Sequence, residues 1–423
     1  MVTPVLGWRL VRSLRNIEPI NFWREVFQIL NATSLSDSQT TIEGLITNLE
    51  TTIENVLDNL APLTRKKIVN RTINFRLSRA TLKLKKQMRL SEQAWRRSKL
   101  NIHRDIYKTD RNSYLHALRK EKECQFRRKL VHIGENSRQV WRQLAEITGN
   151  CLKQSRIKMK QSLPSDSTVS RAQCLADFFS NKVTTIVNSL APEILQGLPV
   201  DCPNFRVNGI MINFNAVTFY DVKKELSNLP AMKKSPLDAL PPGFLRQSDE
   251  FLLYAAQLCN ISFSSGTFPD CLKLSQITPV PKKVDGDLDD LANFRPNSNI
   301  KILGKLFEKL AAVQLVAHIE KENYLHCNQS AYRKGYSTET ATLSVFSDWC
   351  EALDCSRVVI IGSLDVSAAF DTVNHDILLY RLMQAGVMGL ALKWFSSYLK
   401  NRQGIVKVGD NTSQSFLFSS GVP

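Results

Sequence analysis

Asp365 is the residue whose sequence setting points most directly to chemistry. The continuous apolar run 358–361 precedes it, and such a run predicts a strand that is buried on both faces. Three small residues, an aromatic residue and a second aspartate follow it: Ser367, Ala368, Ala369, Phe370 and Asp371. A carboxylate oxygen suits a hard divalent cation, and a turn with little side-chain bulk lets backbone N–H groups face a triphosphate. The stretch therefore predicts phosphoryl transfer from a nucleotide; the alternative is an Asp that only ends a strand and begins a turn.

Hydrophobic spacing predicts the elements that must position this stretch. Helical spacing of apolar residues is found over residues 42–60, 172–190, 251–263 and 301–322. In the last of these helices, the residues expected to point inward are Ile302, Leu306, Phe307, Leu310, Val313 and Ile319. A short strand is expected over residues 276–281 and a hairpin over residues 404–418. These elements predict an α+β fold for the C-terminal half.

A family resemblance covers about the last half of the chain. The segment LDVSAAFDTVNHDILL, residues 364–379, closely resembles the first catalytic motif of reverse transcriptases from non-long-terminal-repeat (LINE-type, jockey-like) retrotransposons. Four upstream segments are similar to the family's fingers blocks, in the family's order: KKSPLDALPPGFL (233–245), ITPVPKK (277–283), NFRPNSNIKILGKLFEKL (293–310) and NQSAYRKGYSTETATL (328–343). An ordered series of motifs is far more specific than any single motif.

The resemblance implies a role for particular residues. Asp365 would be a ligand of both catalytic Mg²⁺ ions, the carbonyl of Val366 would assist one of them, and the Phe370 ring would lie under the sugar and exclude a ribose 2′-hydroxyl. Residues expected at the incoming dNTP are Lys282, Lys283, Arg295, Ser367, Ala368, Ala369 and Phe370. Residues expected along the RNA template are Gln329, Tyr332 and Arg333. A structural, salt-bridged arginine is the alternative for Arg295.

The resemblance also predicts that the chain is a fragment. In the family, GVP is followed by a Gln-Gly-Ser motif and later by an Ala-Asp-Asp hairpin that supplies the remaining metal ligands, whereas this sequence ends at Pro423. We therefore expect the fingers and an incomplete palm of a right-hand polymerase. The intact parent would use Mg²⁺ to make DNA from dNTPs on an RNA template with a DNA primer. One carboxylate cannot hold two Mg²⁺ ions, so the chain itself is predicted to be inactive.

A strongly basic block precedes the polymerase-like half. Of the formal net charge of +17, residues 65–160 contribute 28 Lys and Arg against 7 Asp and Glu, which is +21, and the rest of the chain carries −4. Such an excess predicts contact with nucleic acid, and the residues expected to make it are Lys83, Lys85, Lys86, Arg89, Arg96 and Arg97. Trp95, Tyr107 and Tyr114 could stack on bases or pack between helices. The alternatives are a solvated helical face and, at the level of function, a non-enzymatic nucleic-acid-binding protein derived from a mobile element.

Three regions and an intracellular location are expected. They are a basic, all-helical region at 1–150, a linker with a helix at 151–214, and fingers with a partial palm at 215–423. No apolar run approaches the roughly 20 residues of a membrane span, so no membrane partner is expected and the protein should stay in the nucleus or cytoplasm. The scattered cysteines have no zinc-like spacing. The sequence leaves the oligomeric state open.

Overall fold

A computed structural model of the chain describes nine stretches and divides it into two compact units. The stretches are residues 5–14, 17–34, 41–69, 77–133, 170–189, 209–232, 234–283, 287–366 and 368–422. The first unit comprises residues 1–11 and 64–158, and the second comprises residues 12–63 and 159–423. The predicted boundary at residue 150 lies outside the described residues.

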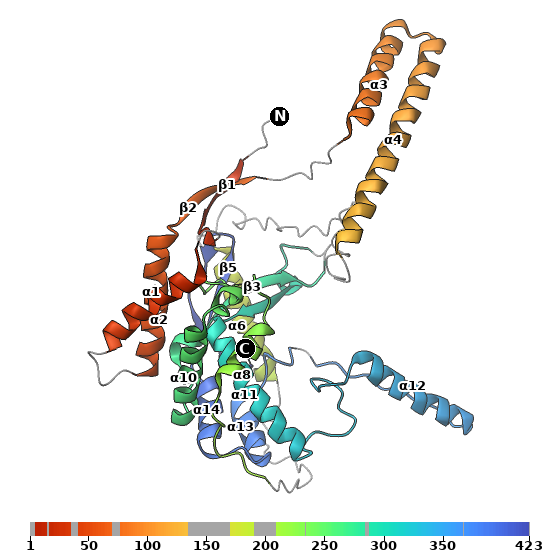
Figure 1. Cartoon of the computed structure of the whole chain (residues 1–423). Helices are drawn as coiled ribbons and strands as arrows, with labels where there is room; N and C mark the ends of the chain where they lie inside the picture. The colour runs from red at the N-terminus through yellow and green to blue at the C-terminus, as the bar shows by residue number, and fades with distance from the viewer. Residues whose placement is uncertain are drawn as a thin grey trace. The chain divides into compact units, whose positions relative to one another are not determined.

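The first unit contains a small sheet and two long helices (Figure 1). Strands β1 (Val5–Val11) and β2 (Thr64–Val69) pair antiparallel, and α3 (Arg79–Ser98) and α4 (Asn101–Ile133) form a helical hairpin. The prediction that residues 1–150 are all-helical is therefore wrong for the two strands. Their ladder joins segments more than 50 residues apart, and helical composition between them carries no signal of that pairing.

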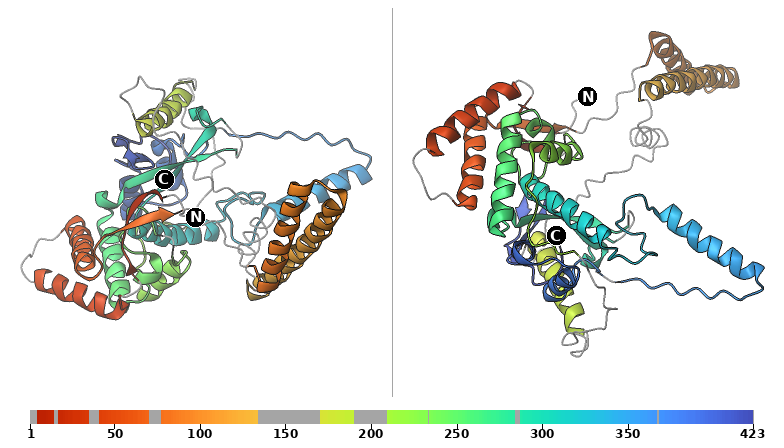
Figure 2. Two further views of the ribbon diagram at one scale, coloured as in Figure 1. Left: turned by 90° about the horizontal axis from the view of Figure 1, so that it is seen from above. Right: turned by 60° about the horizontal axis from the view of Figure 1, so that its bottom comes forward.

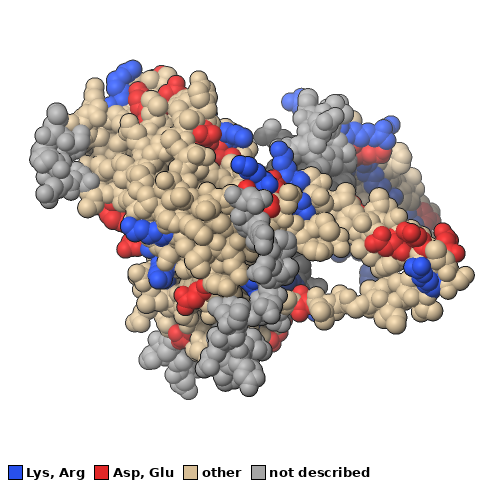
Figure 3. Space-filling view, turned by 90° about the horizontal axis from the view of Figure 1, so that it is seen from below, with Lys and Arg blue, Asp and Glu red and all other residues tan. Residues whose placement is uncertain are grey.

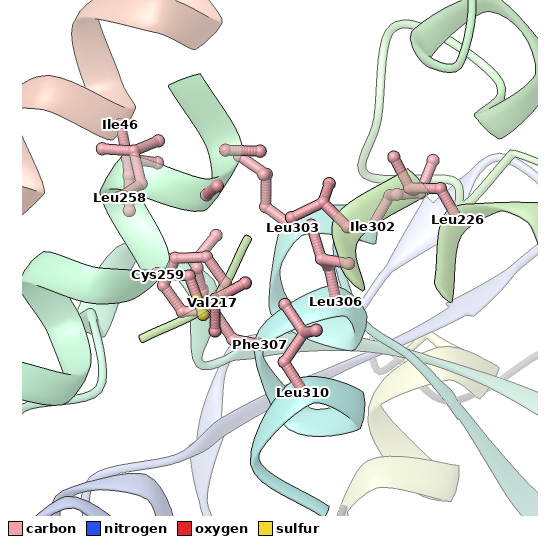
Figure 4. Packing of buried hydrophobic residues seen from close by; sticks show 14 of the residues in the cluster. Ile46, Val217, Leu226, Leu258, Cys259, Ile302, Leu303, Leu306, Phe307 and Leu310 are labelled. Carbon is pink, nitrogen blue, oxygen red and sulfur yellow. The ribbon is translucent and has the colours of Figure 1, made fainter. Parts of the chain in front are cut away.

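Helices build the main core of the second unit. They are α1 (Pro19–Ser34), α2 (Ile42–Leu60), α8 (Phe219–Ser227), α9 (Pro242–Leu245), α10 (Asp249–Ser265), α11 (Ile302–Lys321), α13 (His375–Gln384) and α14 (Gly389–Leu399). Figure 4 shows Leu306 and Phe307 of α11 with Cys259 of α10 in this core. The helices predicted over residues 42–60, 251–263 and 301–322 are confirmed. The expectation that Val313 points inward is wrong, because its side chain is 52% exposed.

A five-stranded mixed sheet forms the second layer of this unit. Its order is β4 (Phe294–Asn299), β3 (Leu274–Pro281), β5 (Gln403–Val408) and β6 (Asn411–Thr412), and β7 (Phe416–Leu417) also pairs with β5. Strands β3 and β5 run parallel, and the other pairs are antiparallel. The short 3₁₀ turn Asp270–Leu272 precedes β3, and a second one, Leu291–Asn293, lies in the connection just before β4. Helix α6 (Arg171–Ser189) packs Leu175 and Phe179 against Ile277 and Val406 of the sheet.

The segment that contains the first motif lies largely outside the core. Helix α12 (Thr338–Asp354) has no buried residue, and Figure 2 shows it clear of the other helices of the second unit. Residues 357–366, which follow it, form no helix or strand, and Leu364 is 98% exposed. The prediction of a strand buried on both faces at 358–361 is therefore wrong for this structure. A buried strand needs neighbouring strands for its N–H and C=O groups, and among the described residues no strand pairs with this segment.

Candidate active site and nucleic-acid surface

A tight turn follows Asp365 and leads into α13. Ala368 has a left-handed backbone with φ of 54°, which its small side chain tolerates better than a bulky one would. The backbone N–H groups of Asp371 and Thr372 donate to the Ala368 carbonyl at 2.9 and 3.1 Å. Asn374 then caps α13, because its side-chain oxygen accepts from the backbone N–H groups of Asp376 and Ile377. The turn expected from the small residues is present; Asp365 is exposed, and Ser367 lies outside the described residues.

The last residues of the described chain bind to this turn. The Val422 and Gly421 N–H groups donate to the carbonyls of Phe370 and Val373 at 2.9 and 2.8 Å. The His375 ring donates from Nε2 to the Gly421 carbonyl at 2.7 Å. Gly421 has φ of +87°, and a Cβ there would lie 2.8 Å from the Asp371 carbonyl oxygen, so only glycine fits without movement. The GVP segment is thus held against the residues that follow Asp365.

The described residues do not by themselves fit a two-magnesium site. Asp365 offers one exposed carboxylate. Within the part of the chain that the structure describes, no group of three or more His, Cys, Asp or Glu side chains could hold a metal ion. Asp371, the nearest aspartate along the chain, is half-buried, and that burial raises the pKa of its carboxyl, partly offset by Lys182. Mg²⁺ prefers octahedral oxygen ligands, and this donor set is too small for two ions.

The three basic residues expected at the triphosphate lie at one end of the β3–β4 hairpin. Lys282 and Lys283 follow β3, and the Lys282 N–H donates to the Asn293 carbonyl at 2.7 Å. Arg295 stands opposite Val280 in the ladder. Lys282, Lys283 and Arg295 are exposed. Arg295 makes no ion pair with another described residue, which does not support the salt-bridged alternative. Among the described residues, no hydrogen bond or ion pair joins this group to Asp365.

The loop before α12 contains the residues expected along the template. Arg333 donates to the carbonyls of His326 and Gln329 at 3.3 and 3.2 Å, and its guanidinium lies over the Tyr336 ring. Its donors therefore stabilise its own loop. Tyr332 is 84% exposed, and its ring contacts the edge of the Phe370 ring at a centroid distance of 6.1 Å. This contact joins the expected template residues to the expected sugar position. Ser337 caps α12, as expected.

The α3–α4 hairpin concentrates basic residues on its surface. Helix α3 has seven Lys and Arg against one Glu, and α4 has nine against four Asp and Glu. By contrast, basic and acidic side chains are interspersed over the described part of the face drawn in Figure 3. Trp95 and Tyr107 stack on each other with centroids 5.5 Å apart, so they pack between the helices and are not open to bases. Tyr114 is half-buried as well.

The C-terminal half of the chain is similar to known proteins. Residues 280–423 match the model of the family described as "Reverse transcriptase (RNA-dependent DNA polymerase)". This part of the chain is therefore similar to reverse transcriptases. The chain is 28% identical over 212 residues to "RNA-directed DNA polymerase from mobile element jockey" of Drosophila melanogaster, a match that covers 49% of this chain and 23% of that protein. It is 26% identical over 207 residues to "Probable RNA-directed DNA polymerase from transposon BS" of the same fly, with 48% and 22% covered.

A third match widens the range of relatives. The chain is 27% identical over 144 residues to "Retrovirus-related Pol polyprotein from type-1 retrotransposable element R2" of Popillia japonica, with 34% of this chain and 19% of that protein covered. The matched segment is thus similar to polymerases of several retrotransposable elements. The chain spans about a quarter of the length of the first of these relatives. None of the described helices is long and apolar enough to cross a membrane.

The sequence did not predict two residues of this candidate site. His375 and Gly421 join the turn after Asp365 to the GVP segment, and they lie 46 residues apart. Nothing local in the sequence signals this contact. The glycine of GVP could have been suspected, because an isolated Gly often marks a backbone with positive φ.

Proposed function

We propose that the chain is a segment of an RNA-directed DNA polymerase from a non-LTR retrotransposon, and that residues 215–423 form its fingers and part of its palm. The intact polymerase makes DNA from dNTPs on an RNA template. The observation that carries the proposal is the meeting of three family motifs at Phe370, whose ring contacts Tyr332 and whose carbonyl accepts from Val422. Motifs that lie far apart in the sequence are thereby neighbours in space.

The proposed roles follow the positions of the side chains. Asp365 is one ligand of the catalytic Mg²⁺ ions, with the Val366 carbonyl beside it, and Lys282, Lys283 and Arg295 attract the triphosphate. Phe370 supports the deoxyribose. Because the described residues supply too few ligands for two ions, the other ligands come from the Ala-Asp-Asp motif of the longer polymerase. The 423-residue chain alone is inactive.

The exposed segment 357–366 supports this proposal. Its continuous apolar residues suit a strand, yet Val358, Ile360 and Leu364 are almost wholly exposed. Each exposed leucine- or isoleucine-sized side chain forgoes about 1.5–3 kcal/mol of burial. We infer that the segment pairs with strands of the longer polymerase, which would bring Asp365 to the edge of a complete palm sheet.

Primer extension on an RNA template tests the proposal. The 423-residue chain is compared with a version extended by the reading frame that follows codon 423. We expect no template-dependent product from the first and Mg²⁺-dependent product from the second. In the extended version, Asp365→Ala should lower the rate about 1,000-fold, equivalent to about 4 kcal/mol of transition-state stabilisation. The matched control Asp410→Ala changes an exposed turn and should leave the rate unchanged.

Two outcomes would overturn this function. One is a downstream frame that encodes neither Gln-Gly-Ser nor Ala-Asp-Asp. The other is Asp365-independent synthesis by the extended chain. Synthesis by the 423-residue chain that depends on Asp365 would instead show that the chain is active by itself.

The charge of the α3–α4 hairpin favours a second function, which is nucleic-acid binding through phosphates. Sixteen Lys and Arg residues against five Asp and Glu residues lie on these two helices. Binding that depends on phosphate contacts weakens steeply with salt, with a slope of about −0.9 per contact on duplex DNA in log K against log salt concentration. Fluorescence anisotropy over a salt series tests this function, which fails if the full chain binds no nucleic acid at low salt.

A further inference from the structure

We propose that the α3–α4 hairpin binds double-stranded nucleic acid, and that it does so with one of its two broad faces. This inference rests on the proposed nucleic-acid binding and adds to it the face and the form of the ligand. One face, which we call the basic face, has Lys85, Arg89, Arg96, Arg104, Lys108, Arg111 and Lys122. The other, which we call the neutral face, has Ala80, Gln87, Ala94, Ile102, Ile106 and Ser113, with Lys120 as a basic residue beyond them.

The contacts between the helices fix which side chains point inward. Trp95 stacks on Tyr107, and Thr81 donates a hydrogen bond to Glu121. Residues of α3 at helical spacing from these, such as Met88, are less exposed than their neighbours. The seam therefore runs along one stripe of each helix. Because successive residues of a helix are rotated by about 100°, the direction of each remaining residue follows from its distance in sequence to that stripe.

The charges are distributed unequally around the seam. On α3, Lys85, Arg89 and Arg96 lie between about 60° and 100° from the seam in one direction, and Ala80, Gln87 and Ala94 lie at similar angles in the other. On α4, Arg104, Lys108 and Arg111 lie on one flank, and Ile102, Ile106 and Ser113 lie on the other, where Lys120 is a single basic residue beyond them. The helices are antiparallel, so equal directions of rotation bring the two basic flanks to the same side of the hairpin. The hydrogen bond from the Gln87 amide to the Asp110 carboxylate, which joins the two helices on the neutral face, agrees with this placement.

The basic face is available to a polyanion. Arg89, Arg104 and Arg111 are exposed, and none of them forms an ion pair with another residue that the structure describes. Two ion pairs involve residues of this face, Arg96 with Glu92 and Lys108 with Asp105, and because both basic side chains are exposed to solvent these pairs are weak. The face is therefore strongly positive. From residue 104 to residue 122 of α4 it extends about 27 Å, and the second row of charges lies on a helix about 8–10 Å away.

The aromatic residues decide between a duplex and a single strand. Proteins that bind single strands without sequence preference combine positive charge with exposed rings on which bases stack. On α3 and α4, no Trp, Tyr or Phe whose side chain the structure describes is exposed. Two rows of cations without stacking rings suit phosphates, which a duplex presents on its outside in two strands. We therefore expect contacts to the phosphates of a duplex and little sequence preference.

Matched variants of the full 423-residue chain test the inference. The basic-face variant is R89Q/R104Q/R111Q, and the control is K83Q/K86Q/R97Q, which removes the same charge from the side of α3 opposite the seam. The sequence predicted contacts at these three control residues, and the proposed choice of face replaces that prediction. Glutamine is a good helix former, and circular dichroism checks that the helices are retained. Anisotropy is measured over a salt series with DNA, RNA and RNA–DNA duplexes of about 20 base pairs and with the matching single strands.

The expected result is a difference between the two variants. Duplexes should bind at least about 10-fold more tightly than single strands. On DNA duplex, the slope of log K against log salt concentration should become shallower by about 2.7 in the basic-face variant, because three phosphate contacts are lost at about 0.9 each. In the control, the slope should change by less than about 0.9, the value for one contact. The three duplexes show which form is preferred.

Each contrary result has a distinct meaning. Equal losses in the two variants would overturn the choice of face. Tighter binding of single strands, lost in Trp95→Ala, would overturn the choice of duplex. Binding only to an acidic polypeptide, with no nucleic acid bound at low salt, would overturn the inference together with the nucleic-acid-binding function on which it rests.

Discussion

Helices α11 and α12 have similar lengths and adjacent places in the chain, yet they differ completely in burial. Helix α11 has Ile302, Leu306 and Phe307 in the core, and α12 has none of its side chains buried, so that Leu343 and Phe346 are 67% and 55% exposed. Both helix sequences contain apolar residues interspersed with polar ones. The difference shows that hydrophobic spacing predicts a helix, whereas burial depends on whether other elements cover its apolar side.

Replacing one phenylalanine in each helix should give the largest difference in the free energy of unfolding between matched variants. Phe307→Ala takes a wholly buried ring out of the core and should lower the free energy of unfolding by about 3–5 kcal/mol. Phe346→Ala removes an exposed ring and should change it by less than about 0.5 kcal/mol. Urea unfolding of the two variants measures this. A large loss for Phe346→Ala would mean that a partner, such as a second copy of the chain, covers α12 in solution.

The two helices also differ at their first turns, and this difference should depend on pH. The partly buried Asp238 carboxylate accepts from the Ile302 N–H at the start of α11, whereas the exposed Ser337 caps α12. Burial raises the pKa of Asp238 to about 7, with a smaller contribution from Glu50 and opposition from the Ile302 hydrogen bond and two lysines. Because the folded-state pKa lies above the unfolded value of about 3.9, the protonated carboxyl stabilises the fold below about pH 4. That stabilisation is lost as the pH rises through about 7.

Asp238→Asn should remove this pH dependence, because the amide oxygen can still accept from Ile302 and no proton titrates. Between about pH 5 and pH 8, the original chain should lose about 2.5 kcal/mol of unfolding free energy relative to the variant. Urea unfolding at several pH values measures the difference. The control Asp410→Asn lies in an exposed turn and should leave the profile unchanged. Parallel pH profiles for the original chain and for Asp238→Asn would contradict the prediction.

Two glycines in turns show the same difference between a covered and an open position, with a smaller expected effect on stability. Gly421 and Gly335 have nearly equal φ angles of +87° and +85°, but a Cβ at Gly421 meets two carbonyl oxygens within 2.9 Å and a Cβ at Gly335 meets nothing within 4 Å. Gly335→Ala should cost about 1 kcal/mol from backbone strain alone, and Gly421→Ala should cost about 1–3 kcal/mol. Hydrogen exchange should show lower protection of residues 370–375 only in Gly421→Ala. Equal effects would mean that the GVP segment does not bind the turn.

The elements that the sequence predicted well are those set by local spacing. The helix at 42–60 follows from its apolar residues, and the cap at Ser337 follows from the residue type. The contacts that the sequence could not predict join residues that lie far apart along the chain. The β1–β2 ladder, the bond from His375 to Gly421 and the exposure of residues 357–366 all depend on which segments meet in space. The family resemblance pointed to Asp365 and Phe370 through their motif, and their geometry came only from the fold.

The docking of α1 and α2 has a consequence for synthesis on the ribosome. The Trp23 indole N–H donates to the Phe244 carbonyl, and Lys301 forms an ion pair with Glu50, so both helices depend on residues made much later. About 200 residues separate α2 from the far side of its core, and at about 5–20 residues per second the nascent helices wait for about 10–40 s. During that time their apolar sides, with Phe22, Ile46 and Leu49, have no native cover. A nascent chain with this order of elements exposes apolar helix sides of the kind that chaperones bind.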